Sequence, residues 1–174
     1  MTMTTDNHET RLFDADTLEP LGLTQQQHLD PSLTGPSSAA HAACDPKTGD
    51  IFNYNLAFGR VSTYKVFRAN VKTGEVDVLT EITDARPAYI HSLSLTENFV
   101  ILCVWPAYFG KAGVKILWYR NLMEGFAPFD ANEKAIWYVV DRKHGRGIVA
   151  KFTSPAFFSF HTTNAWGRAA GSGK

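Results

Sequence analysis

The hydrophobic positions of this chain fall in short runs that are rich in β-branched and aromatic side chains. Such runs favour strands, because these side chains pack well on a pleated sheet and the runs are too short for helices. The predicted strands are residues 64–68, 76–79, 99–105, 114–118 and 135–140. The best helix candidate is residues 121–126, a single turn at most. The pattern therefore predicts an all-β protein.

Polar segments of one type recur between these runs. Residues 14–19, 45–50 and 70–75 each place Asp or Asn three residues before Thr, and residues 141–145 form a fourth such segment. Asp or Asn can accept a hydrogen bond from its own backbone two residues on, and Gly accepts the positive φ that closes a turn. Antiparallel hairpins at intervals of roughly 25 to 35 residues suit a β-propeller better than a sandwich, although the period alone does not separate the two. The length accommodates about three blades.

Composition and charge exclude several classes of protein. Of the 174 residues, 44% are hydrophobic and 13% aromatic, which is enough to bury a sizeable core. The 17 basic residues balance 17 acidic ones, so nothing indicates a nucleic-acid partner. The longest apolar run, residues 99–105, covers about a third of a bilayer, so no transmembrane segment is expected, and peripheral membrane contact stays open.

The cysteines and the two ends of the chain bear on its location and extent. Cys44 and Cys103 lack Cys-x-x-Cys spacing, so we expect neither a disulfide framework nor a cysteine zinc site. Residues 1–7 are polar and do not form a secretory signal. We therefore expect a cytoplasmic protein. Residues 167–174 are small and polar after a dense aromatic stretch, which predicts a flexible tail at a truncation point.

Three of the six histidines lie in apolar or small-residue surroundings. His41 has only small neighbours in residues 37–44, so a metal ion and a substrate can approach its ring. Strand alternation would place His91 on one face with positions 89, 93 and 95, and His161 on one face with positions 157, 159 and 163. A histidine in such a row either bonds a backbone carbonyl in the core or binds a metal with one nitrogen while donating the other.

Their separations of 50 and 70 residues fit successive propeller blades that each offer one ligand to a common axis. Neutral imidazoles suit Fe(II), Zn(II) or Cu(II). Such long spacing has low specificity, so a shared metal site and three structural histidines both stay open. His8, His28 and His144 lie in polar or basic stretches, and we expect them at the surface.

Other chemistry has little support in the sequence. There is no Gly-x-Ser-x-Gly elbow, no Walker loop and no Gly-x-Gly-x-x-Gly, so neither nucleophilic hydrolysis nor nucleotide binding is indicated. The aromatic stretch at residues 105–110 is better explained as core than as an apolar entrance.

The three histidines lie within longer motifs. Residues 40–50 read Ala-His-Ala-Ala-Cys-Asp-Pro-Lys-Thr-Gly-Asp, and Asn-Tyr-Asn follows at residues 53–55. Residues 89–102 read Tyr-Ile-His-Ser-Leu-Ser-Leu-Thr-Glu-Asn-Phe-Val-Ile-Leu, and residues 157–166 read Phe-Phe-Ser-Phe-His-Thr-Thr-Asn-Ala-Trp. In this order, and with the turn at residues 14–22, they resemble the carotenoid cleavage oxygenase family, most closely its fungal members. The resemblance extends from about residue 11 to residue 166.

The resemblance implies a seven-bladed β-propeller in which four histidines hold Fe(II), and His41, His91 and His161 match the first three. It implies a dioxygenase acting on single donors with incorporation of O₂. The substrate would be a carotenoid, an apocarotenoid or a stilbene-like compound, whose carbon–carbon double bond is cleaved to give two carbonyl products. The implied partners are therefore O₂ and an apolar conjugated small molecule. Neutral ligands leave coordination positions where O₂ can be activated beside such a substrate.

The chain also departs from the family pattern. The fourth histidine of the family lies near the C-terminus of a chain several times longer, and no residue after His161 supplies it. The glutamates that orient the ligand rings have no counterpart in the motifs, and Gly167 stands where an acidic residue often follows Asn-Ala-Trp. We therefore expect residues 1–166 to be an N-terminal to middle fragment of an oxygenase propeller with little or no turnover by itself.

Two other functions compete with this interpretation. One is a non-catalytic propeller that binds a partner and whose histidines are structural. The other is a zinc hydrolase with three histidines and a water.

Overall fold

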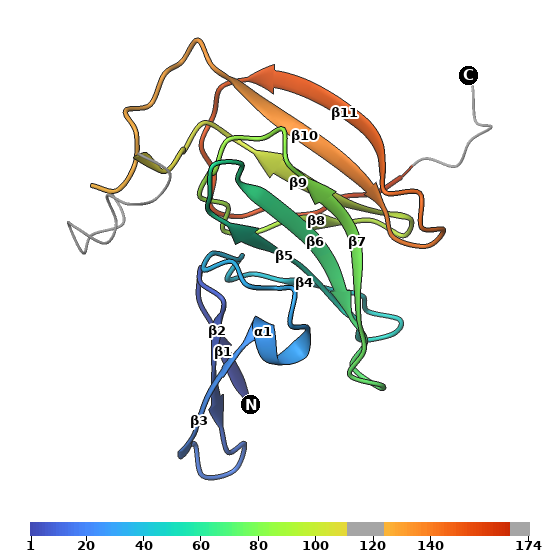
Figure 1. Ribbon diagram of the computed structural model, residues 1–174. Coiled ribbons are helices and arrows are strands. Elements are labelled where there is room, and N and C mark those ends of the chain that lie inside the picture. The colour runs from blue at the N-terminus through green and yellow to red at the C-terminus, as the bar shows by residue number, and fades with distance from the viewer. Residues whose placement is uncertain (111–123, 168–174) are drawn as a thin grey trace.

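A computed structural model describes residues 1–110 and 124–167 (Figure 1). These residues form three antiparallel sheets and one single-turn helix, so the prediction of an all-β protein is confirmed. The predicted strand at 114–118, most of the predicted helix at 121–126 and the predicted tail beyond residue 167 lie outside the described residues. Within that helix prediction, Glu124 and Gly125 form a turn and Phe126 pairs with Phe109 in an isolated bridge.

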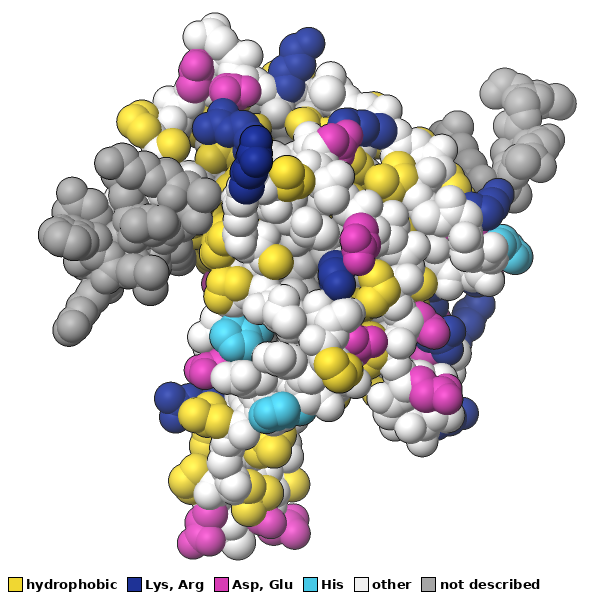
Figure 2. All heavy atoms as spheres, viewed as in Figure 1, with side chains coloured by type: hydrophobic (Ala, Val, Ile, Leu, Met, Phe, Trp, Pro, Cys, Tyr) yellow, Lys and Arg dark blue, Asp and Glu magenta, His cyan; other side chains and the backbone are white. Residues whose placement is uncertain are grey.

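The N-terminal sheet projects from the rest of the molecule (Figure 1). It contains β1 (Thr2–Thr4), β2 (Glu9–Phe13) and β3 (Pro20–Gln25) in that order, and α1 (Gln26–Leu29) follows. Hydrophobic side chains are exposed on this sheet, as Figure 2 shows, and they include Met3, Leu21 and Leu23. The sequence did not predict α1, because one turn of helix is too short to have a hydrophobic period.

The other two sheets have four strands each and lie side by side (Figure 1). One contains β4 (Ala43–Cys44), β5 (Ile51–Ala57), β6 (Thr63–Ala69) and β7 (Val76–Ile82) in that order. The other contains β8 (Ser94–Leu95), β9 (Phe99–Val104), β10 (Lys134–Asp141) and β11 (Ile148–Pro155), and each strand again pairs with its neighbour in the chain. Four antiparallel strands in sequential order are the pattern of a propeller blade. In each blade the inner edge is a strand of only two residues.

The four predicted turns are present, with the predicted mechanism. The side chains of Asp14, Asp45, Asn70 and Asp141 each accept a hydrogen bond from the backbone N–H two residues on. In the second and third turns Gly49 and Gly74 have φ of 80° and 75°. The first turn places Leu18 at the corresponding position with φ of 60°. A leucine therefore occupies a conformation that favours glycine.

One hydrophobic core spans the two blades. Its largest fully buried side chains include Tyr54, Tyr64 and Trp105. Trp105, Tyr108 and Phe109 are all buried, so the interpretation of residues 105–110 as core is confirmed. Burial raises the pKa of the Cys103 thiol to about 12, and neither cysteine forms a disulfide. Among the described residues, no helix is long and apolar enough to cross a membrane.

Polar contacts in the core hold the segment that leads into β8. The Tyr54 hydroxyl donates to the carbonyl oxygen of Ile90 at 2.8 Å. The Tyr64 hydroxyl donates to the carbonyl oxygen of Arg86 at 2.8 Å and accepts from the N–H of Ala88 at 2.7 Å. Burial raises the pKa of both tyrosines, so they are protonated donors. The first blade thus fixes the path of residues 86–90 in the second.

Candidate metal centre

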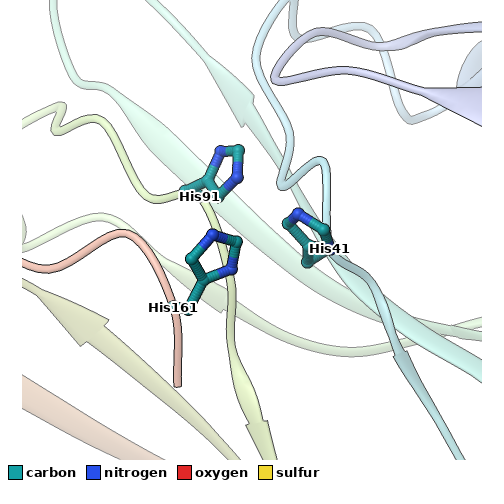
Figure 3. A group of neighbouring side chains, drawn as sticks. All are labelled: His41, His91 and His161. Carbon is teal, nitrogen blue, oxygen red and sulfur yellow. The ribbon is translucent and has the colours of Figure 1, made fainter. Parts of the chain in front are cut away.

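Three histidines from distant parts of the chain converge at the inner ends of the blades. The ring centroids of His41 and His91 lie 4.7 Å apart, those of His41 and His161 4.8 Å, and those of His91 and His161 5.0 Å. One ligand atom from each residue lies within 4.8 Å of the other two. Figure 3 shows the three rings gathered around a common point. The structure therefore brings together the three residues that the sequence analysis selected.

The histidines do not lie within strands, which corrects the sequence analysis. His41 precedes β4 and His91 precedes β8, while His161 follows β11 in a segment that has no strand. The His91 segment connects β7, the outer strand of one blade, to β8, the inner strand of the next, and the His41 segment leads into β4, the inner strand of the first blade. The expected alternation also fails around His161, because residues 156–167 pair with no strand among the described residues. Phe157 packs on Trp105 and Trp137, whereas Phe160 lies next to His91.

The backbones of the first two histidine segments are joined directly. The N–H of His41 donates to the carbonyl oxygen of His91 at 3.1 Å. An isolated parallel bridge pairs His41 with Ser92. Because the Tyr54 hydroxyl holds Ile90, the residue before His91, the His91 side of this junction is anchored to the core.

A carboxylate lies behind the ring of His91. Nδ1 of His91 is 2.8 Å from both carboxylate oxygens of Asp6. Asp6 also accepts from the Tyr89 hydroxyl at 2.7 Å and from the N–H of Ala40, the neighbour of His41, at 3.1 Å. A hydrogen bond from Nδ1 to a carboxylate places the ring proton on Nδ1 and leaves the Nε2 lone pair free for a metal.

Asp6 is an acidic residue that orients a ligand ring, in a chain whose motifs show no counterpart of the orienting glutamates of the family. Sequence analysis missed it because the expectation concerned glutamates, and because Asp6 lies in a polar stretch that carries no hydrophobic pattern. Two features of the structure reveal the role of Asp6, namely its half-buried side chain and the raised pKa of Tyr89. Desolvation raises that pKa most, and the hydrogen bond that the Tyr89 hydroxyl donates to Asp6 raises it further.

Aromatic side chains flank the cluster. The ring of Phe160 meets His91 edge-on with centroids 5.5 Å apart, and it lies 5.0 Å from the ring of Phe158. Phe158 and Phe160 are 44% and 47% exposed, so they offer apolar surface beside the histidines. His8, His28 and His144 are not part of the cluster; His28 and His144 are exposed and His8 is half-buried.

The donor set fits a transition-metal ion. Three imidazole nitrogens suit Fe(II), Zn(II) and Cu(II). Two ligand nitrogens about 2 Å from one ion lie at most about 4 Å apart, and small side-chain rotations bring the observed separations into that range. The hydrogen bond of His91 to Asp6 is the outer contact that metal-binding histidines commonly make.

Comparison with known proteins gives consistent results. The family described as retinal pigment epithelial membrane protein matches residues 1–173. The chain is 48% identical to a torulene dioxygenase of Fusarium fujikuroi over 166 residues, which cover 94% of this chain and 29% of that protein. It is 46% identical to a carotenoid dioxygenase of Neurospora crassa over 172 residues, which cover 98% and 28%. The chain thus spans about 29% of the length of the curated relatives that it matches.

Solved structures show the same fold. The lignostilbene dioxygenase of Pseudomonas brassicacearum matches with a TM-score of 0.65 at 19% identity, covering 88% of this chain and 30% of that one. A mutant of the Synechocystis apocarotenoid oxygenase matches with a TM-score of 0.60 at 17% identity, covering 89% and 32%. The two blades and their connections therefore have the arrangement of part of a seven-bladed carotenoid oxygenase propeller.

Proposed function

Since the chain belongs to the carotenoid cleavage oxygenase family, we propose that it carries three of the ligands of a non-haem Fe(II) dioxygenase. The complete protein cleaves a carbon–carbon double bond of a carotenoid, an apocarotenoid or a stilbene-like substrate with O₂ and forms two carbonyl products. The observation that carries this proposal is the convergence of His41, His91 and His161.

The side chains of this chain have separate roles in the proposed site. His41, His91 and His161 hold the ion, and Asp6 keeps the proton of His91 on Nδ1. When bound, Fe(II) supplies the redox chemistry that activates O₂, and neutral imidazoles leave it the open positions that this requires. Phe160 meets the ring of His91, and Phe158 lies beside Phe160, so the two place apolar surface next to the site.

The substrate class is supported by the exposed aromatic surface and by the relatives. Phe158 and Phe160 can pack against a planar conjugated chain, because aromatic faces bind apolar π-systems well. The relatives are named for torulene, for carotenoids and for lignostilbene, which are all conjugated compounds. We accordingly assign an apolar conjugated alkene and O₂ as the partners of the site. A cytoplasmic location is part of the proposal, supported by two cysteines that form no disulfide.

The family resemblance implies a fourth histidine ligand, and we propose that residues outside this chain supply it. Residues 1–166 then form part of the oxygenase propeller. By itself the 174-residue chain should bind iron weakly and turn over little or no substrate, because one ligand and most of the apolar cavity are missing.

Iron content tests the proposal. The purified complete protein and its His91→Ala variant are loaded with Fe(II) without oxygen, desalted and analysed for metal. We expect iron in the first and a large loss in the second, with His144→Ala as the matched control that keeps its iron. Absence of iron, or iron that His91→Ala does not reduce, would overturn the proposal and favour structural histidines.

The zinc hydrolase is separated from the oxygenase by oxygen dependence. Three histidines and a water are a known catalytic zinc set. Substrate turnover by the complete protein should stop when O₂ is removed and return when O₂ is readmitted. Turnover that continues without O₂, with zinc as the bound metal, would identify a hydrolase instead.

A further inference from the structure

The segment that carries His161 has few hydrogen bonds to the rest of the molecule. Residues 156–167 follow the end of β11 and form no strand. Among the described residues, the hydrogen bonds that join this segment to other parts of the chain involve Ser92 and Leu93. The backbone on either side of His161 is therefore held by a small number of hydrogen bonds.

Ser92 makes two of these contacts, one on each side of His161. Its hydroxyl donates to the carbonyl oxygen of Phe160 at 2.9 Å and accepts from the N–H of Thr162 at 2.9 Å. Ser92 is only 4% exposed, so neither hydrogen bond competes freely with water. A single hydroxyl thus fixes both peptide groups that flank His161.

Ser92 is also placed at the junction of the other two histidines. It is bonded covalently to His91, and it pairs with His41 in a parallel bridge. The Thr162 hydroxyl adds one contact on the far side of His161, by donating to the carbonyl oxygen of Leu93 at 3.1 Å. Displacement of Ser92 would therefore alter the distance between His161 and both other rings.

We infer that Ser92 is a positioning residue that holds His161 in the geometry needed for a shared metal ion. This inference rests on the proposed function, because it assigns Ser92 a role in that same site. Ser92 acts only through the His161 segment and touches no ligand of the metal with its side chain. Residues that orient metal ligands in this way are commonly worth roughly 10- to 100-fold in metal affinity.

The test uses Co(II) as the metal probe, since its absorption spectrum reports both binding and coordination number. Ser92→Ala should weaken Co(II) binding about 10-fold or more and change the spectrum. Ser92→Thr, which keeps a hydroxyl, should restore most of the affinity. Ser94→Ala is the matched control, because the Ser94 hydroxyl makes no hydrogen bond with a described residue, and it should leave binding unchanged.

A double-variant comparison separates positioning from general loss of structure. In a His161→Ala background, Ser92→Ala should cause no further loss of Co(II) affinity, because its effect passes through His161. An equal loss in both backgrounds would overturn the inference. If Ser92→Ala does not fold, Ser92→Cys takes its place, since it nearly keeps the volume but weakens both hydrogen bonds.

Amide hydrogen exchange of the metal-free protein distinguishes this inference from the proposed function. Ser92→Ala should accelerate exchange at the Thr162 amide, which loses its acceptor, and unchanged exchange would overturn the inference. The unsubstituted protein could bind no metal while Ser92→Ala still accelerates exchange at the Thr162 amide. In that case the Ser92 hydrogen bonds exist and the proposed metal function fails.

Discussion

The Asp6 carboxylate lies 2.8 Å from Nδ1 of His91, although 85 residues separate the two in sequence. The same carboxylate accepts the N–H of Ala40, next to His41. One half-buried acid therefore orients the ring of the second histidine and fixes the approach to the first. The N-terminal segment is in this way part of the candidate site.

Asp6→Asn should weaken metal binding by roughly 10- to 100-fold. The amide cannot accept hydrogen bonds at both of its ends, so the Nδ1 proton of His91 and the Tyr89 hydroxyl lose a shared charged acceptor. Co(II) or Fe(II) titration measures the change. Asp16→Asn is the control, because Asp16 is an exposed acid in the turn between β2 and β3 of the same sheet. Equal affinities for Asp6→Asn and the unsubstituted protein would contradict this role.

Part of the site could be predicted from sequence, and the rest depends on tertiary contacts. His41, His91 and His161 could be selected because each lies among apolar or small residues within a recognisable motif. Asp6 could not, since a polar residue in a polar stretch shows its partner only after folding. Ser92 was missed for a similar reason, because its hydroxyl reaches residues about 70 positions later in the chain.

Leu18→Gly should stabilise the protein by about 1 kcal/mol, because leucine at positive φ is strained and glycine is not. Leu18 has φ of 60° and its side chain is 60% exposed, so little packing is lost. Gly74→Leu is the reciprocal substitution. A Cβ at Gly74 would meet no atom within 4 Å, so its cost is conformational, and we expect destabilisation of about 1 kcal/mol. Urea unfolding of both variants measures these changes in stability. A loss of stability in Leu18→Gly would contradict the prediction.

Tyr54→Phe should destabilise the fold by about 1 to 2 kcal/mol. The substitution removes a fully buried hydroxyl and leaves the carbonyl oxygen of Ile90 without its donor. Tyr108→Phe serves as a control, because Tyr108 is also buried and its hydroxyl makes no hydrogen bond with a described residue. Thermal and urea unfolding of the three proteins provide the comparison. Similar stabilities for Tyr54→Phe and Tyr108→Phe would show that the Ile90 contact contributes little.

The fold could be predicted from the sequence where turn residues flank hydrophobic runs. Gly49 and Gly74 end turns whose Asp or Asn begins them, and the strands on either side are present. β5 was not predicted, because Asn53 and Asn55 interrupt its hydrophobic run. Both amides are buried and bond backbone groups of Ala39 and Gly35, so they act as tertiary contacts that no local pattern reveals.

The stability conferred by Asp141 should depend on pH. Arg146 and the amides of Lys143 and Arg146 hold the pKa of this carboxyl well below its ordinary value. A depressed pKa in the folded state means that the carboxylate stabilises the fold above about pH 4 and that this contribution disappears as the pH falls further. Asp141→Asn should therefore destabilise the protein at neutral pH and destabilise it less as the pH falls below about 4.

Urea midpoints of the unsubstituted protein and Asp141→Asn, measured at several pH values between about 7 and 3, test this dependence. Asp16→Asn controls for the loss of one negative charge. The gap between the two proteins should stay constant above about pH 4 and narrow below it, and a gap that does not narrow down to about pH 3 would rule out the linkage.

The central claim is that three histidines share one metal ion, and metal titration of single variants tests it most directly. We predict that the purified protein binds one Co(II) ion, and that His41→Ala, His91→Ala and His161→Ala each weaken this binding strongly. The matched variants His28→Ala and His144→Ala should bind like the unsubstituted protein. If the three central substitutions weaken binding no more than these two surface substitutions do, the histidines do not form a shared metal centre.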